Sequence, residues 1–135
     1  MSVGILIVTH GKMGHYLLDT AADLIGDVPL KTDVLEVRRV QDTNVLLRQG
    51  TRTIERLDMG QGVLILTDAF GSTPSNIASR LHVDDKTIVV AGVNLPMLVR
   101  IFNYPELDLR EMARAAIEGG QRGVMICDKP PAGAE

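Results

Sequence analysis

The chain has 135 residues, 14 basic and 17 acidic side chains that give a formal charge of −3, and one cysteine, Cys127. This length favours a single domain that needs neither a disulfide framework nor a structural metal, and Cys127 is expected to be buried in the last strand. Well-mixed charges and 3% aromatic residues argue against a nucleic-acid surface. No apolar run reaches the ~18 residues of a membrane span and the N-terminus has no signal-peptide pattern, so we expect a cytoplasmic protein without direct membrane insertion.

Segments typical of strands and helices alternate along the chain. The continuous apolar run 3–8 is typical of a strand covered on both faces, and the apolar spacing of 17–25 is that of a helix. Further strands are predicted at 32–38, 62–68 and 87–93, and a short one at 124–127. Further helices are predicted from Asp42 through Leu57, in a short segment from Ser72, and at 96–103 and 109–119.

This alternation predicts an α/β fold: a doubly wound, mostly parallel four-stranded sheet with helices on both faces and a short fifth C-terminal strand. One domain is expected at 1–127, followed by a flexible tail at 128–135. Ligands of such folds bind beyond the carboxyl ends of the strands, where the strand order reverses. The loops in that position are "THGKMG", "VRRVQDT", "TDAFGSTPSN" and "GVNLPM".

The common nucleotide and metal motifs are absent from the sequence. A Walker loop fails because Leu6 stands where its first glycine belongs and Met13 where its hydroxyl residue belongs. There is no G-x-G-x-x-G after a strand and no G-x-S-x-G. The histidines, His10, His15 and His82, do not have metal-ligand spacing, so we expect neither a metal nor a cofactor.

A histidine and a carboxylate remain, each at the end of a buried strand. If the first and third strands are neighbours, His10 meets Asp68, which can fix the tautomer and leave the other ring nitrogen as a nucleophile. The "GSTPSN" segment from Gly71 adds a helix N-terminus that can bind an anion. Each feature alone is compatible with a structural histidine, a turn aspartate or an ordinary helix start. Together they favour transient phosphorylation of His10.

These motifs resemble a known family. "IVTHG", "TDAFGSTPSN" and "VVAGVNLPML" resemble the mannose-type enzyme IIA of the bacterial phosphoenolpyruvate-dependent sugar phosphotransferase system, over about residues 1–127. The resemblance implies that His10 accepts a phosphoryl group from the phosphocarrier HPr and passes it to a IIB component for sugar uptake. It also implies that Asp68 is the partner of His10 and that 71–73, including Ser72 and Thr73, bind the phosphoryl group. Family members form homodimers by exchanging the final strand, here 124–127.

Two further roles are expected around His10. Lys12 is a candidate for holding the phosphoryl dianion, with a solvated lysine as the alternative. The expected partner-docking residues are Met13, Phe70, Pro96 and Met97, although Met13 and Phe70 are also compatible with a core position. A phosphocarrier that serves a regulatory target or a dihydroxyacetone kinase, and a non-catalytic binding module, stay open as alternative functions.

Overall fold

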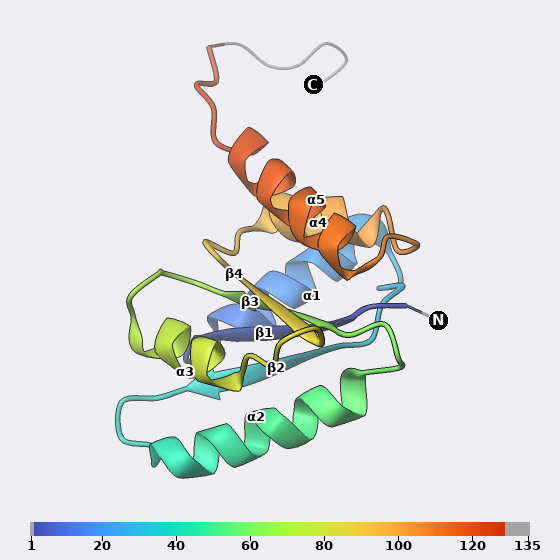
Figure 1. The fold of residues 1–135 in the computed structure, drawn as a ribbon. Coiled ribbons are helices and arrows are strands. Elements are labelled where there is room, and N and C mark those ends of the chain that lie inside the picture. Colours follow the sequence, from blue (N-terminus) through green and yellow to red (C-terminus); the bar gives the residue numbers. More distant parts are fainter. Residues whose placement is uncertain (1, 129–135) are drawn as a thin grey trace.

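The computed structural model describes residues 2–128, which are built around a four-stranded sheet (Figure 1). The strands are β1 (Gly4–His10), β2 (Thr32–Val37), β3 (Val63–Thr67) and β4 (Thr87–Ala91). They are all parallel and lie in the order β2-β1-β3-β4. The order reverses between β1 and β3, and this is the point at which doubly wound folds bind their ligands.

Helices cover both faces of the sheet, as the sequence predicted. One face carries α1 (Met13–Ile25), α4 (Leu95–Phe102) and α5 (Leu109–Arg122), and the other carries α2 (Thr43–Leu57) and α3 (Thr73–Leu81). The expected α/β fold, with its parallel four-stranded sheet between two helical layers, is confirmed.

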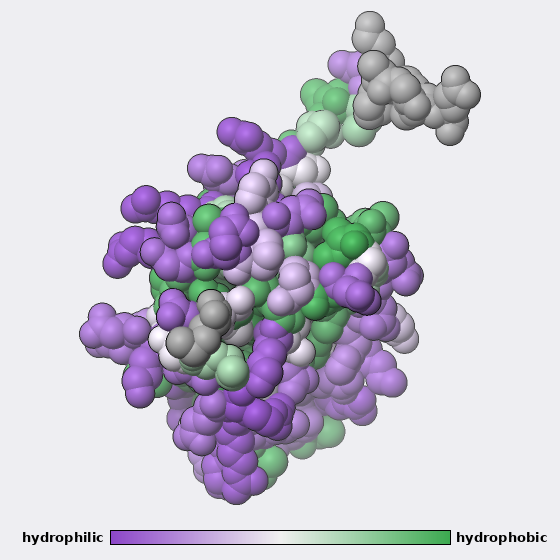
Figure 2. All heavy atoms as spheres, turned by 90° about the vertical axis from the view of Figure 1, so that its right-hand side faces the viewer, coloured by the Kyte–Doolittle hydropathy of each residue, from purple (hydrophilic) through white to green (hydrophobic). Residues whose placement is uncertain are grey.

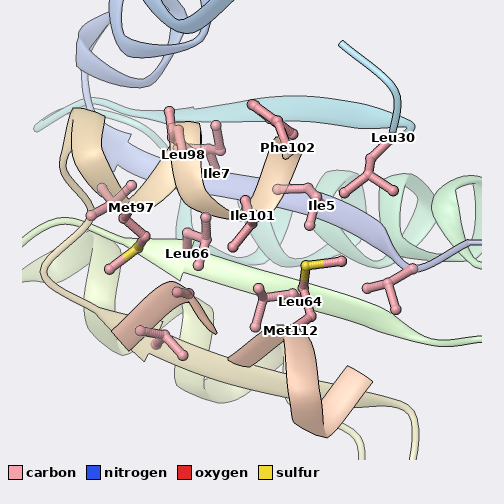
Figure 3. Close-up of a cluster of buried hydrophobic side chains, with 14 of the residues drawn as sticks. Ile5, Ile7, Leu30, Leu64, Leu66, Met97, Leu98, Ile101, Phe102 and Met112 are labelled. Carbon is pink, nitrogen blue, oxygen red and sulfur yellow. The ribbon is translucent and has the colours of Figure 1, made fainter. Parts of the chain in front are cut away.

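The first strand shows why the sheet is apolar on both sides. Ile5 and Ile7 enter the core cluster beneath α1, α4 and α5, whereas Leu6 and Val8 enter the cluster beneath α2 and α3. All four side chains are fully buried, and each such burial contributes about 1.5–3 kcal/mol. Figure 3 shows the first cluster, with Ile5 and Ile7 facing residues of α4. A strand buried in this way holds its last residue, His10, in a fixed position at the carboxyl ends of the strands.

The first helix begins earlier than its apolar spacing predicted. It starts at Met13 instead of residue 17, because Gly14 allows the helix to lie directly on the strands. The backbone N–H of Gly14 donates to Thr9 Oγ1 at 2.8 Å, and a Cβ at this position would lie 2.9 Å from Val34 Cγ1. The polar cluster after β1 is therefore mostly the first turn of a helix.

The expected fifth strand does not form in the single chain. Residues 124–127 have no strand neighbour, and Val124, Met125 and Ile126 are 78%, 68% and 86% exposed. This segment extends away from the sheet after α5 (Figure 1), and its hydrophobic residues project from the body of the molecule in Figure 2. Cys127 is exposed as well, contrary to its expected burial, because the strand that would have covered it is missing. Strand exchange in a dimer stays a prediction.

Two other expectations concern the ends of the chain and the membrane. A flexible tail was expected at 128–135, and its residues from 129 onward lie outside the described part of the chain. Among residues 2–128, none of the helices combines the length and the apolar character needed to cross a bilayer.

Candidate functional site

His10 and Asp68 meet where the sheet order reverses. Val8 of β1 pairs with Thr67 of β3, so the two side chains emerge side by side at the carboxyl ends of neighbouring strands. His10 Nδ1 lies 2.7 Å from Asp68 Oδ2, and the same oxygen accepts the backbone N–H of His10 at 2.9 Å. The histidine side chain is 56% exposed, whereas that of the aspartate is only 8% exposed. A buried carboxylate thus orients an exposed imidazole.

The hydrogen bonds of Asp68 keep its carboxyl group ionised. Burial by itself would raise its pKa, but the hydrogen bonds from the His10 backbone and ring and from the Ala69 N–H lower the pKa below its ordinary value. The second oxygen, Oδ1, accepts the Ala69 N–H at 2.8 Å and the Ser72 hydroxyl at 3.4 Å. A carboxylate at Nδ1 favours the tautomer that carries its proton there, which leaves a lone pair on the exposed Nε2.

The loop after Asp68 turns the N-terminus of α3 toward the same edge. Gly71 has a φ of +89°, a left-handed conformation that favours glycine. The Ser72 hydroxyl donates to the Ala69 carbonyl at 2.6 Å and does not cap the helix. The first-turn N–H groups of α3 therefore have no side-chain cap within the described chain. Such groups are a favourable site for an anion.

A hollow of about 310 Å³ lies beside the histidine. It is lined by His10, Val37, Arg38, Arg39, Gln41, Thr43, Leu46 and Thr73. The loop after β2, "VRRVQDT", was expected at this edge of the sheet, but none of its residues was selected as a site residue from the sequence. Its place follows from the strand order, because β2 is the other neighbour of β1 and its carboxyl end opens on the same edge.

The positive charge of Lys12 acts on the Glu36 carboxyl. It is an exposed residue just before α1, and its side chain makes no hydrogen bond or ion pair among residues 2–128. The hydrogen bond from Arg38 lowers the pKa of the Glu36 carboxyl despite burial, and the charges of Arg38, His15 and Lys12 add to this effect. A phosphoryl-holding role of Lys12 stays a prediction.

The expected docking residues are not all on the surface. Phe70 is 89% exposed and Met13 is 43% exposed, so neither is a core residue of the single chain, and Pro96 is exposed at the start of α4. Met97 is only 3% exposed and lies in the core cluster shown in Figure 3. The prediction of Met97 as a docking residue is wrong, because the first turn of α4 directs this side chain toward the sheet.

The two other histidines already have partners. His15 Nε2 lies 3.0 Å from Glu36 Oε1. The ring of His82 contacts the Thr87 hydroxyl at 2.8 Å and Asp84 Oδ1 at 3.1 Å. Within the part of the chain that the structure describes, no group of three His, Cys, Asp or Glu residues is arranged to hold a metal ion.

The fold and the site together define a class: doubly wound α/β proteins with an exposed histidine, oriented by a buried carboxylate, at the reversal of strand order. The family model described as "PTS system fructose IIA component" matches residues 4–117. The chain belongs to this family, the mannose- and fructose-type enzyme IIA components of the phosphotransferase system.

Individual relatives agree with this assignment. The chain is 34% identical over 136 aligned residues to the mannose-specific EIIAB component of Escherichia coli K12, covering 97% of this chain but only 41% of that protein. It is 33% identical to the fructose-specific EIIA component of Bacillus subtilis, covering 94% of this chain and 88% of the relative. The mannose/sorbose-specific IIA subunit from Enterococcus faecalis superposes with a TM-score of 0.84 at 22% identity, covering 97% and 98% of the two chains, which shows a common fold.

Proposed function

We propose that this chain is a cytoplasmic phosphoryl carrier in which His10 Nε2 accepts a phosphoryl group from HPr. The group then passes to a IIB component during sugar uptake, or to a regulatory target. The observation that carries the proposal is the pairing of His10 Nδ1 with the buried Asp68 at 2.7 Å, which leaves Nε2 as the exposed nitrogen.

The proposed step needs only a nucleophile and an oriented charge. The lone pair of Nε2 forms a bond to phosphorus while the bond between phosphorus and the donor atom breaks, and its electron pair stays on the donor. Asp68 keeps the proton on Nδ1 and stabilises the positive charge that the ring acquires. The second transfer reverses these events with the acceptor protein as the attacking group.

The α3 N-terminus is the proposed site for the phosphoryl oxygens. Within 71–73, the N–H of Gly71 donates to Ser75 Oγ at 3.3 Å and that of Ser72 to the Ala69 carbonyl at 3.1 Å, so the proposed donor is the N–H of Thr73, which has no side-chain cap and lies beside the hollow at His10. Lys12, the exposed residue just before α1, contributes positive charge. The exposed side chains of Met13, Phe70 and Pro96 are the proposed apolar contacts with both protein partners.

We also propose that two copies form a dimer by exchanging residues 124–127. Three consecutive apolar residues of this segment are exposed, and β4 is an edge strand that has a neighbour on one side only. Val124 lines a hollow of about 240 Å³ with Val90 and Ala91 of β4, so the segment leaves α5 close to that edge. An unpaired edge beside an exposed apolar segment favours pairing between chains.

The carrier proposal is tested by incubating the protein with phosphoenolpyruvate, enzyme I and HPr and measuring its intact mass. Phosphorylation of one histidine adds about 80 Da, which is lost in acid because the phosphorus–nitrogen bond is acid-labile. His10→Ala is expected to gain no mass, whereas His15→Ala and His82→Ala serve as controls that still do. Phosphorylation of His10→Ala excludes His10 as the acceptor, and an unmodified wild-type chain favours the non-catalytic binding module.

A further inference from the structure

The hollow beside His10 offers hydrogen-bond donors from the loop after β2. Of the described residues that line it, none is acidic, whereas Arg38, Arg39, Gln41 and two threonines are polar or basic. The side-chain oxygen Oε1 of Gln41 accepts the Arg38 backbone N–H at 2.7 Å, so the side-chain NH₂ of Gln41 remains available as a donor. The side of the imidazole that faces this loop therefore suits a negatively charged group.

The two arginines differ in their availability. Arg38 donates to Glu36 Oε2 from Nη2 at 2.8 Å and from Nε at 3.2 Å, and the other oxygen of Glu36 lies 3.0 Å from His15 Nε2. These contacts hold the guanidinium of Arg38 on a carboxylate. The side chain of Arg39, in contrast, makes no hydrogen bond or ion pair with any residue in 2–128, and it lines the hollow with His10.

From this difference we infer that Arg39 holds the phosphoryl group on His10, and that Glu36 limits how far Arg38 assists. The inference rests on the proposed function, which it extends by assigning Arg39, just after β2, as a phosphoryl-binding residue and Glu36, within β2, as a positioning residue that acts through Arg38. A phosphoryl group on Nε2 is a dianion with three acceptor oxygens, and the planar guanidinium binds such groups through several N–H donors at once. Arg38 can contribute only by leaving Glu36, so the carboxylate competes with the phosphoryl group for the same cation.

A phosphoryl group that is held more tightly also releases its last proton more readily. Loss of Arg39 removes charge-assisted donors and raises the pKa of the phosphoryl group. Loss of the Glu36 charge has the opposite effect, because it frees Arg38 and removes a nearby negative charge. For a partly solvated site we expect about a threefold change in the acid dissociation constant, or about half a pKa unit, in each direction.

The test does not depend on HPr. Phosphoramidate, a small-molecule donor, phosphorylates histidine directly: Nε2 bonds to phosphorus, the phosphorus–nitrogen bond of the reagent breaks, and ammonia leaves with its electron pair. The pKa of the resulting phosphoryl group is then measured by phosphorus NMR against pH in wild type, Arg39→Gln, Arg39→Lys and Glu36→Gln. Arg52→Gln is the matched control, since this exposed arginine lies on α2 and outside the hollow.

The variants are expected to shift the phosphoryl pKa in opposite directions. Arg39→Gln raises the phosphoryl pKa, Arg39→Lys raises it less, Glu36→Gln lowers it, and Arg52→Gln leaves it unchanged. Equal values for Arg39→Gln and Arg52→Gln overturn the role of Arg39, and an unchanged or raised pKa in Glu36→Gln overturns the role of Glu36. Wild-type protein that phosphoramidate modifies but HPr does not would refute the carrier function alone, and a His10 that neither reagent modifies would refute both.

Discussion

At the scale of single residues, Asp68 and His10 have two different tasks: the aspartate orients the ring, and the histidine exposes it. The aspartate is 8% exposed and accepts hydrogen bonds on both oxygens, so its position is fixed. The histidine is 56% exposed, so one face of its ring remains accessible to another protein. This combination of a fixed carboxylate and an open ring suits the proposed transfer of a phosphoryl group between protein partners.

Replacing Asp68 by asparagine should slow phosphoryl transfer. The amide keeps the shape of the carboxylate but loses the charge that stabilises the ring as it is phosphorylated. A comparable change in serine-protease triads costs about 10⁴ in rate, and we expect a smaller loss of about 10–10² because His10 need not take up a proton. Rapid-quench transfer from phosphorylated HPr measures the effect, and an unchanged rate would reduce Asp68 to a turn residue.

The same variant should lose part of the acid sensitivity of the fold. The pKa of Asp68 is lowered on folding, so its stabilising contribution is complete above the unfolded pKa and is lost as the pH falls through the lower, folded value. Asp68→Asn lacks this titration. Its free energy of unfolding, measured by urea denaturation between about pH 5 and pH 2, should therefore fall less steeply than that of wild type.

Phe70 and Phe102 form a matched pair for the docking proposal. Phe70 is 89% exposed, so Phe70→Ala should change stability by no more than about 0.5 kcal/mol while transfer from HPr slows. Phe102 is 3% exposed in the core, and Phe102→Ala should cost about 3–5 kcal/mol. Thermal melts and transfer assays on both variants give the comparison. Normal transfer in Phe70→Ala would remove this side chain from the docking surface.

The sequence allowed His10 and Asp68 to be selected because both lie at the carboxyl ends of buried strands that become neighbours at the reversal of strand order. Met97 was misassigned although the signal was present. Met97, Leu98, Ile101 and Phe102 are spaced as one buried stripe of α4, and this spacing places Met97 in the core. The contribution of Arg39 to the hollow could not be predicted, because it depends on the path of a loop and on the contact between Arg38 and Glu36.

At the scale of elements, α1 is positioned by a glycine that faces the sheet. Gly14→Ala should destabilise the protein by about 1–3 kcal/mol, because the new Cβ would lie 2.9 Å from Val34 Cγ1 and 3.0 Å from Ile7 Cγ2. The control is Thr20→Ala on the exposed side of the same helix, where alanine has the better helix propensity. Denaturant unfolding measures both. Equal stability of the two variants would mean that α1 can shift outward without cost.

The elements themselves were largely predictable, because continuous apolar runs and helical spacing identify buried strands and amphipathic helices. The start of α1 was not, because the stretch from Gly11 to Tyr16 contains few apolar residues. Its helical form depends on contacts with β1 and β2, including the hydrogen bond from Gly14 to Thr9. Tertiary packing determines this boundary, and spacing within the helix does not reveal it.

For the whole molecule, the proposed strand exchange predicts a dimer that depends on 124–127. Deleting 124–135 should yield a monomer or an aggregate by light scattering, because the apolar segment that joins the two chains is lost. Deleting only 129–135 is the control and should preserve the dimer. A full-length protein that stays monomeric at high micromolar concentration would contradict the exchange.

The hydrogen bond between His10 and Asp68 joins residues that are 58 positions apart in the chain. During synthesis the histidine is made early, yet it has no oriented partner until β3 has been added and has aligned beside β1. Such long-range pairing of parallel strands is slow compared with helix formation. Competence to accept a phosphoryl group should therefore appear late in folding, and the tautomeric state of this one imidazole would report that the central pair of strands has closed.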